Sequence, residues 1–263
     1  MKKLQALSQK IIIIMILLLN IEVNSQCITD GGLANETGLK TWCWSDITIP
    51  NYSNSKGVPF SNNQLHIDSE CNENAITIVD DRIHFYVDPI NPPVEGWCSG
   101  QSYNKRAEIY TNSWDVRHPI GTEEWFGFNY RLEDNYIPDV DSEWLFFQVH
   151  NGVVGTSPHF EIMVANDHQY GASGGELVVI NNAFINPANG GWGDFEATRI
   201  IPTAGEELDI VMHTVWGDES NGRLQVWING QNVYDKQVRT VYTDYPWAGN
   251  AKFGIYKWTW SNA

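Results

Sequence analysis

The stretch Glu143-Trp-Leu-Phe-Phe-Gln-Val-His150 gives the clearest indication of how this chain folds. Successive side chains of a β-strand point to opposite faces, so Phe146, Gln148 and His150 are expected on one face. The remaining apolar side chains are expected to point into a core: Leu145, Phe147 and Val149. A strand that presents glutamine and histidine together is either a half-exposed edge strand or a strand that contributes to a site.

Two other stretches favour the second interpretation. Arg106-Ala-Glu-Ile-Tyr110 places Arg106, Glu108 and Tyr110 on one face of a strand. Lys252-Phe-Gly-Ile-Tyr-Lys-Trp258 likewise gathers three polar or aromatic side chains on one face: Lys252, Tyr256 and Trp258. If the three strands lie side by side in one sheet, they bring Arg, Gln, His, Lys and Tyr together in one site.

The N-terminus has the layout of a secretory signal peptide. Three lysines precede the apolar run Ile11–Leu19, which is shorter than the roughly 20 residues that a membrane span needs. Val23 and Ser25 stand at the −3 and −1 positions of a cleavage site before Gln26. We therefore expect a secreted protein whose residues 1–25 are removed and whose residues 26–263 form a single domain.

The chain is strongly acidic. Removing residues 1–25 takes away three lysines and one glutamate, so the formal net charge changes from −16 to −18. Such a charge argues against nucleic acid as a partner and favours a soluble protein that is not bound to a membrane. An anionic substrate would require the cationic side chains to converge locally. We expect a monomer.

Four cysteines lie in the first part of the chain: Cys27, Cys43, Cys71 and Cys98. In an exported protein an even number indicates two disulfides, for which three pairings are possible. No Cys-x-x-Cys spacing indicates a zinc site. The pairing is not determined by the sequence, although Cys71–Cys98 is favoured because it would join neighbouring segments.

In the rest of the chain the sequence predicts many short strands and no helix. Residues 26–69 are rich in Gly, Asn, Ser and Pro and are expected to form loops with short strands. Asp80-Asp81 and Asn229-Gly230 mark hairpins. The expected strands cover residues 75–79, 82–87, 106–110, 124–132, 143–150, 159–165, 176–181, 195–201, 208–216, 223–228 and 252–258. This pattern predicts an all-β protein, a β-sandwich of the jelly-roll kind with a concave substrate groove.

Carbohydrate is the substrate class that this composition favours. The chain contains 12 Trp and 11 Tyr, whose rings can pack on the apolar faces of sugars. A retaining glycosidase needs two carboxyl groups about 5–5.5 Å apart, and jelly-roll enzymes often supply them as Glu-x-Asp-x-x-Glu. Here Glu207 and Asp209 begin that pattern, but Met212 replaces the second catalytic carboxylate. A hydrolase is therefore disfavoured.

The pooled Arg, Gln, His, Lys and Tyr suit a different reaction, the β-elimination of a uronic acid. Such an enzyme must neutralise the sugar carboxylate, remove the C5 proton and protonate the leaving glycosidic oxygen. Arginine or glutamine can hold the carboxylate and stabilise the enolate charge. Histidine or tyrosine can act as the base. A non-catalytic sugar-binding module is the competing class, but it would not need a proton-transfer pair.

Three motifs resemble one known group of enzymes: Arg-x-Glu at Arg106, Gln-x-His at Gln148, and Lys-Phe-Gly-Ile-Tyr at Lys252. In this order they are similar to the signature strands of jelly-roll polysaccharide lyases. That group includes heparin lyase I, glucuronan lyases, alginate lyases and ulvan lyases of marine bacteria. The resemblance covers roughly residues 103–258 and extends to Glu124-Trp-Phe-Gly-Phe and Gly222-Arg-Leu-Gln-Val-Trp-Ile-Asn-Gly.

The resemblance implies a role for each motif residue. His150 would be the base or the carboxylate neutraliser, Tyr256 the base and acid, and Lys252 a cationic partner. Gln148 and Arg106 would hold the carboxylate. The residues implied in substrate binding or orientation are Glu108, Tyr110, Asn129 and Trp258. Arg106 and Glu108 would also be compatible with a structural ion pair in the sheet.

The resemblance also implies a substrate, and the sequence differs from the family at two points. The chain is most similar to short secreted ulvan lyases of marine Flavobacteria, so ulvan is favoured over glucuronan or another polyuronate. Asn250 replaces a tyrosine of the alginate lyases. Family members continue into a final strand, so we expect a missing C-terminal region after Ala263.

No cofactor is expected to be required. The loop residues Asp139, Asp141 and Glu143 are candidates for a structural calcium ion, although a solvated acidic loop is the favoured explanation.

Overall fold

The computed structural model describes residue 44 and residues 47–52, 56–60, 65–70, 75–87, 105–111, 120–153, 155–190, 192–247 and 249–257. The signal peptide, all four cysteines and Trp258 lie outside these ranges, so the expectations for cleavage, disulfides and Trp258 remain predictions. No helix among the described residues is long and apolar enough to span a membrane.

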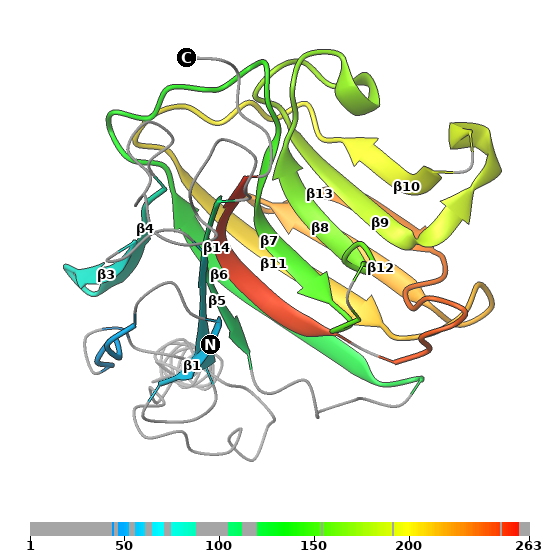
Figure 1. Cartoon of the computed structure of the whole chain (residues 1–263). Helices are drawn as coiled ribbons and strands as arrows, with labels where there is room; N and C mark the ends of the chain where they lie inside the picture. The colour runs from blue at the N-terminus through cyan, green and yellow to red at the C-terminus, as the bar shows by residue number, and fades with distance from the viewer. Residues whose placement is uncertain are drawn as a thin grey trace, which may run out of the picture.

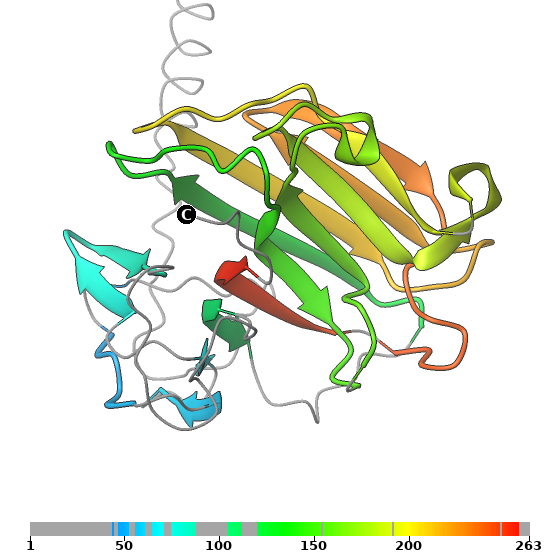
Figure 2. The same cartoon turned by 45° about the horizontal axis from the view of Figure 1, so that its top comes forward.

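Two antiparallel sheets form the body of the protein, as Figures 1 and 2 show. In spatial order the larger sheet contains β1 (Lys56–Pro59), β2 (Leu65–Glu70), β5 (Lys105–Thr111), β14 (Asn250–Lys257), β7 (Trp144–His150), β8 (Phe160–Val164), β9 (Leu177–Asn186) and β10 (Trp192–Ala197). The smaller sheet contains β13 (Gln231–Gln237), β12 (Arg223–Ile228), β11 (Glu207–Val215) and β6 (Glu123–Arg131). This is the expected all-β sandwich of the jelly-roll type.

The main core fills the space between the sheets. Strands β7, β8 and β9 contribute one wall, and β6, β11 and β12 contribute the other. Phe147 of β7 stacks on Phe128 of β6 with ring centroids 5.1 Å apart, and Phe160 stacks on Trp216 at 5.4 Å. Phe147, Phe160 and Trp216 are fully buried, and each contributes on the order of 2–3 kcal/mol through the removal of apolar surface from water.

A separate hairpin covers the other half of the larger sheet. Strands β3 (Ile76–Val79) and β4 (Arg82–Phe85) are joined by Asp80-Asp81, both with positive φ, as the two-residue turn predicted from the sequence requires. Their apolar side chains cluster with the inner face of β2 and β5.

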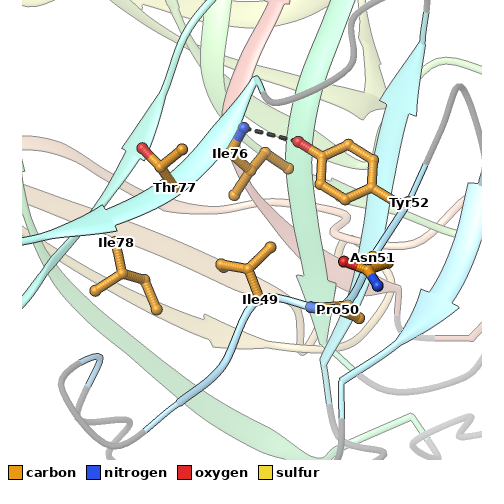
Figure 3. A pocket seen from close by; sticks show the side chains of 7 residues that line it. All are labelled: Ile49, Pro50, Asn51, Tyr52, Ile76, Thr77 and Ile78. Carbon is orange, nitrogen blue, oxygen red and sulfur yellow. Dashed lines mark hydrogen bonds between the residues drawn. The ribbon is translucent and has the colours of Figure 1, made fainter.

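A pocket of about 350 Å³ lies between this hairpin and residues 49–52. Figure 3 shows its lining, in which the Ile76 amide donates a 2.8 Å hydrogen bond to the Tyr52 hydroxyl. Its lining includes none of the candidate catalytic side chains. The pocket therefore belongs to the packing of the hairpin.

The simple alternation expected for Glu143–His150 is wrong in the first half of β7. Leu145 pairs with Met163 and Phe147 with Ile162, so Phe146 is an extra residue, a β-bulge. The bulge turns Phe146 into the main core beside Phe147, while Leu145 joins a small apolar cluster with Met163. Only Gln148 and His150 keep the predicted polar face.

Most strands agree with their predicted ranges, and the main differences are at β2, β9 and β10. Strand β9 continues to Asn186, beyond the predicted end at residue 181. Strand β2 lies in the region expected to be mostly loop, and it carries site residues that the sequence analysis did not single out. Strand β10 ends at Ala197, before the predicted end at Ile201. Two short 3-10 turns, η3 (Gln169–Gly171) and η4 (Pro187–Asn189), interrupt the connections on either side of β9.

Candidate active site

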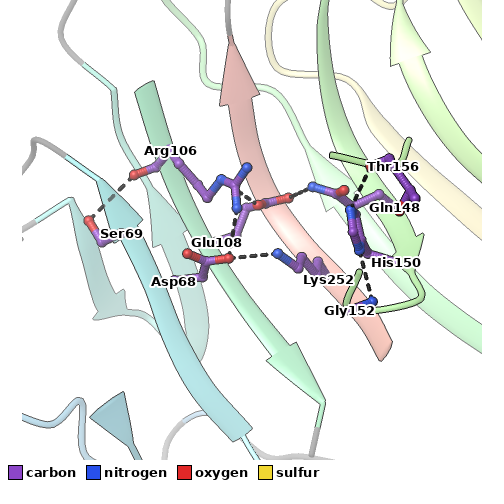
Figure 4. Close-up of polar contacts among 9 residues, drawn as sticks. All are labelled: Asp68, Ser69, Arg106, Glu108, Gln148, His150, Gly152, Thr156 and Lys252. Carbon is purple, nitrogen blue, oxygen red and sulfur yellow. Dashed lines mark hydrogen bonds and ion pairs between the residues drawn. The ribbon is translucent and has the colours of Figure 1, made fainter. Parts of the chain in front are cut away.

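The three predicted motif strands are neighbours, because β14 lies between β5 and β7. Lys252 pairs directly with Tyr110 on one side and with Gln148 on the other. Directly paired residues of an antiparallel sheet have side chains on the same face. The side chains of the three motifs therefore meet on one face of the larger sheet, as Figure 4 shows for β5, β14 and β7.

Asp68 of β2 is the centre of the charged cluster, although the sequence analysis did not single it out. Its Oδ2 accepts a hydrogen bond of 2.7 Å from Lys252 Nζ and one of 2.9 Å from Arg106 Nη1. Burial raises the pKa of Asp68, but Lys252 and Arg106 outweigh it and lower the pKa to about 2. Asp68 is therefore ionised at neutral pH and holds both cations in place.

Glu108 connects this cluster to Gln148. Gln148 Nε2 donates a 2.7 Å hydrogen bond to Glu108 Oε1, and Arg106 Nε lies 3.3 Å from Glu108 Oε2. Glu108 is fully buried, and this burial raises its pKa, although Arg106 and Lys252 act in the opposite direction. The cluster thus combines two cations with two carboxylates, of which Glu108 accepts a proton more readily than Asp68.

His150 is held by backbone groups through both ring nitrogens (Figure 4). The Gly152 amide lies 3.0 Å from Nδ1, and the Thr156 carbonyl oxygen lies 3.0 Å from Nε2. An amide can only donate and a carbonyl can only accept, so the proton of the neutral ring is on Nε2. Burial and, secondarily, Lys252 lower the pKa of His150 to about 4. His150 is therefore neutral at neutral pH and cannot neutralise a carboxylate as a cation.

Tyr256 lies beneath Arg106. The two residues pair across β14 and β5, and the guanidinium carbon of Arg106 is 4.0 Å from the centroid of the Tyr256 ring. The pairing of β14 with β5 is regular here, but its pairing with β7 contains a second bulge, because three residue steps of β14, from Phe253 to Tyr256, match two steps of β7. Gly254 lies in the bulge with a φ of 138°. A Cβ atom there would lie 2.1 Å from the Ala107 carbonyl oxygen, so the position requires glycine.

Two further side chains flank the charged cluster. Tyr110 is buried and stacks on His66 of β2, with ring centroids 5.0 Å apart. Glu161 of β8 pairs directly with Gln148, and its Oε1 accepts a 3.1 Å hydrogen bond from Asn182 Nδ2. Burial raises the pKa of Glu161 to about 7. His66 and Glu161, like Asp68, were not predicted from the sequence.

A family model for polysaccharide lyases matches residues 57–263, which include every element of this cluster. The chain belongs to the polysaccharide lyase family.

Solved structures of polysaccharide lyases are similar to this chain at low sequence identity. Alginate lyase Aly36B is 15% identical over 84% of this chain and 86% of its own, with a TM-score of 0.50. An endo-β-1,4-glucuronan lyase from Trichoderma reesei is 19% identical over 60% of this chain and 65% of its own, with a TM-score of 0.43. An alginate lyase from Pseudomonas aeruginosa is 17% identical over 70% and 77%, with a TM-score of 0.45. No curated protein matches the sequence of the lyase.

Asn129 does not line the same face as the motif residues of the lyase, so that expectation is wrong. It lies on β6 of the smaller sheet, where its Nδ2 donates a 2.8 Å hydrogen bond to Asp209. Phe128 and Tyr130, its neighbours in sequence, pack into the core, so Asn129 points away from the larger sheet. The resemblance had implied a place for Asn129 in the groove of the motif residues, but β6 belongs to the smaller sheet.

The candidate calcium ligands do not converge in the lyase. Asp139 lies 3.0 Å from Lys257 Nζ and accepts hydrogen bonds from the backbone of Asp141 and Ser142, while Glu143 accepts one from Asn166. Among the residues that the structure describes, no group of three or more His, Cys, Asp or Glu could hold a metal ion. The loop residues instead have structural partners.

The fold also shows where the incomplete glycosidase pattern lies. Asp209 lies on the exposed side of β11 and Met212 is fully buried in the core. The pattern therefore places its acidic residues on the sheet that does not carry the motif cluster.

Proposed function

We propose that the protein cleaves a uronic-acid-containing polysaccharide by β-elimination. The observation that carries this proposal is the meeting of Arg106, Gln148, His150 and Lys252 on one face of three adjacent strands, with Tyr256 beneath Arg106. These are the residue types that the reaction needs to hold a carboxylate and to transfer a proton.

Arg106 and Gln148 are the residues that we assign to the substrate carboxylate. Each is already oriented by Glu108, which restricts both side chains before substrate enters. Such preorganisation matters because donors that are already aimed at the developing charge need no reorganisation during the reaction. The carboxylate of the sugar would add a negative charge beside Glu108, which favours uptake of a proton by that buried group.

Tyr256 is the residue that we assign as base and acid. In the unliganded arrangement the Nδ1 lone pair of His150 is occupied by the Gly152 amide, so His150 does not offer a free acceptor. As a phenolate beside the Arg106 guanidinium, Tyr256 would remove the C5 proton, the C4–C5 double bond would form, and the C4–O bond would break. The phenol formed in this way would then give its proton to the leaving oxygen, which regenerates the phenolate. His150 would be a neutral hydrogen-bonding partner at this centre.

For the substrate we propose ulvan, a sulfated rhamnose–uronic acid polymer, and for the location the outside of the cell. Support for ulvan comes from the similarity of the sequence to short secreted ulvan lyases. Support for export comes from the signal-peptide layout of residues 1–25. Glucuronan or another polyuronate is the runner-up substrate.

The test is the ultraviolet absorbance of the unsaturated uronate product, measured with ulvan, glucuronan, alginate and heparin in separate reactions. Growth of the absorbance with ulvan alone supports the full proposal. An increase in absorbance with a different polymer would support β-elimination and identify that polymer as the substrate instead of ulvan. New reducing ends without absorbance would indicate hydrolysis, and retardation on an affinity gel without any cleavage would indicate a binding module. Either of these last two results refutes the proposed reaction.

A further inference from the structure

The exposed face of the smaller sheet carries an ordered group of aromatic rings, far in the fold from the motif cluster. Trp125 of β6 pairs directly with His213 of β11, and Trp227 of β12 lies one row along. The rings of Trp125 and His213 are 4.2 Å apart and 18° from parallel, and those of Trp125 and Trp227 are 6.0 Å apart and 15° from parallel. We call Trp125, His213 and Trp227 the Trp125 platform.

Trp125 covers His213 and is itself largely exposed. His213 is only 7% exposed although its side chain is on the outward face of the sheet, whereas Trp125 is 60% exposed. The stacked indole accounts for the burial of the imidazole beneath it. The Trp125 ring therefore packs against His213 and Trp227 and still presents much of its surface to solvent.

The support under Trp125 is fixed by a chain of polar contacts. His213 Nδ1 lies 2.8 Å from Gln225 Oε1, and Gln225 Nε2 donates a 2.9 Å hydrogen bond to Asp235, which also binds Arg223. On the other side, His213 Nε2 lies 2.8 Å from Glu123 Oε1. A ring held in this way loses little conformational entropy when a ligand packs on Trp125.

There is room for a ligand beside the indole. Gly127 is the next outward position of β6, and a Cβ atom there would meet nothing within 4 Å. Its partner Val211 is 39% exposed, so an apolar floor continues from the rings along the sheet. The hydrogen-bonding side chains Gln225, Asp209 and Asn129 border this floor.

Flat, exposed aromatic rings bordered by hydrogen-bonding groups are suited to a sugar, whose ring has an apolar C–H face and hydroxyls at its edge. The charge around the platform restricts the kind of sugar that can bind. Around the platform the described carboxylates are Glu123, Asp209, Glu207 and Asp235, and the arginines Arg82 and Arg223 are each already paired to one of them. An acidic surface on a protein of net charge −16 repels a polyanion such as the proposed substrate.

We propose that the Trp125 platform is a second carbohydrate-binding site, specific for an uncharged glycan chain. It lies on the smaller sheet, so a glycan bound there would leave the motif face of the larger sheet free. The site would hold the enzyme on a neutral polysaccharide while the active site acts on an anionic one.

The test is affinity electrophoresis of the full chain in gels that contain hydroxyethyl cellulose, galactomannan or xyloglucan as uncharged probes. We expect retardation by at least one of them and a loss of affinity of at least about tenfold, equivalent to about 1.4 kcal/mol, in Trp125→Ala. Trp125→Phe should retain part of the binding. Ile185→Ala is the matched control, because Ile185 is an equally exposed apolar side chain, 66% exposed, on the larger sheet.

Three results would overturn the proposal. The first is the absence of retardation by every uncharged probe, and the second is equal retardation of the Trp125→Ala variant and the parent protein. The third is a concentration-dependent dimer, seen by sedimentation, that Trp125→Ala abolishes, because a second copy would then be the occupant. Thermal unfolding by circular dichroism checks that each variant is folded. None of these measurements depends on lyase activity, so the outcome is independent of the proposed reaction.

Discussion

Glu161 should make the protein less stable as the pH rises, and Glu161→Gln should remove that effect. Glu161 is only 9% exposed, and burial raises the pKa of its carboxyl from the ordinary 4.5 to about 7. Between these two values the folded state retains a proton that the unfolded state releases. Stability is therefore fully present below about pH 4.5 and falls as the pH rises towards about 7.

The size of the effect follows from the pKa difference. A difference of one pKa unit corresponds to about 1.4 kcal/mol, so the change at Glu161 amounts to about 3 kcal/mol between acidic and mildly alkaline pH. Glutamine cannot ionise and retains the Oε1 acceptor that binds Asn182 Nδ2. Relative to the parent protein, the free energy of unfolding of Glu161→Gln should thus rise by about 2.5 kcal/mol between pH 5 and pH 8, because part of the effect is already present at pH 5.

Urea unfolding at pH 5 and pH 8 measures this difference directly. Comparing the parent and the variant at each pH cancels the contributions of titrating groups that do not interact with Glu161. Glu108 is not one of them, because its charge also raises the pKa of Glu161. Asp167→Asn is the matched control, since the Asp167 side chain is 56% exposed. An equal pH dependence in the parent and in Glu161→Gln would refute the reasoning, as would a similar gain in Asp167→Asn.

The remaining predictions concern the motif cluster. Asp68→Asn should destabilise the protein by about 3–5 kcal/mol in urea unfolding, because it leaves Lys252 and Arg106 buried without their shared carboxylate, and a loss below about 1 kcal/mol would contradict this. His150→Ala and Tyr256→Phe should each lower turnover at least about a hundredfold in the absorbance assay, and near-normal activity in both would refute the assigned roles. Gly254→Ala should cost at least about 2 kcal/mol, because its Cβ would overlap the Ala107 carbonyl in a strained backbone conformation. Gly127→Ala, where a Cβ meets nothing within 4 Å, is its control and should change stability by less than about 0.5 kcal/mol.

Strand alternation predicted the most important part of the site. It placed Arg106, Glu108 and Tyr110 on one face of β5 and Lys252 with Tyr256 on one face of β14, and the structure confirms both faces. The two-residue turns at Asp80-Asp81 and Asn229-Gly230 also follow from local chemistry, because these residue types tolerate positive φ. Rules of strand alternation and turn chemistry suffice where a strand alternates regularly between its two faces.

The features that the sequence did not predict depend on strand pairing and sheet order, which the alternation of side chains within one strand does not reveal. Asp68 alternates correctly in Leu65-His-Ile-Asp-Ser, where Leu65 and Ile67 face the core, so an alternation search inside the expected loop region could have found it. The bulge at Phe146 had no such signal, since every residue around it is apolar. Asn129, for which the resemblance had implied a role in substrate binding, was misplaced because a match of local sequence does not give the sheet to which a strand belongs.

The position of β14 between β5 and β7 has a consequence for when the site can exist. The Lys252–Asp68 ion pair joins residues 184 positions apart, and the last described strand of the chain completes the middle of the sheet. Loop closure over such separations is slow, and it comes after local strands have formed. A growing chain that has not yet reached residue 250 holds Asp68 and Glu108 without Lys252. Catalytic competence is therefore expected to arise in the last step of folding, so that activity reports completion of the entire sheet.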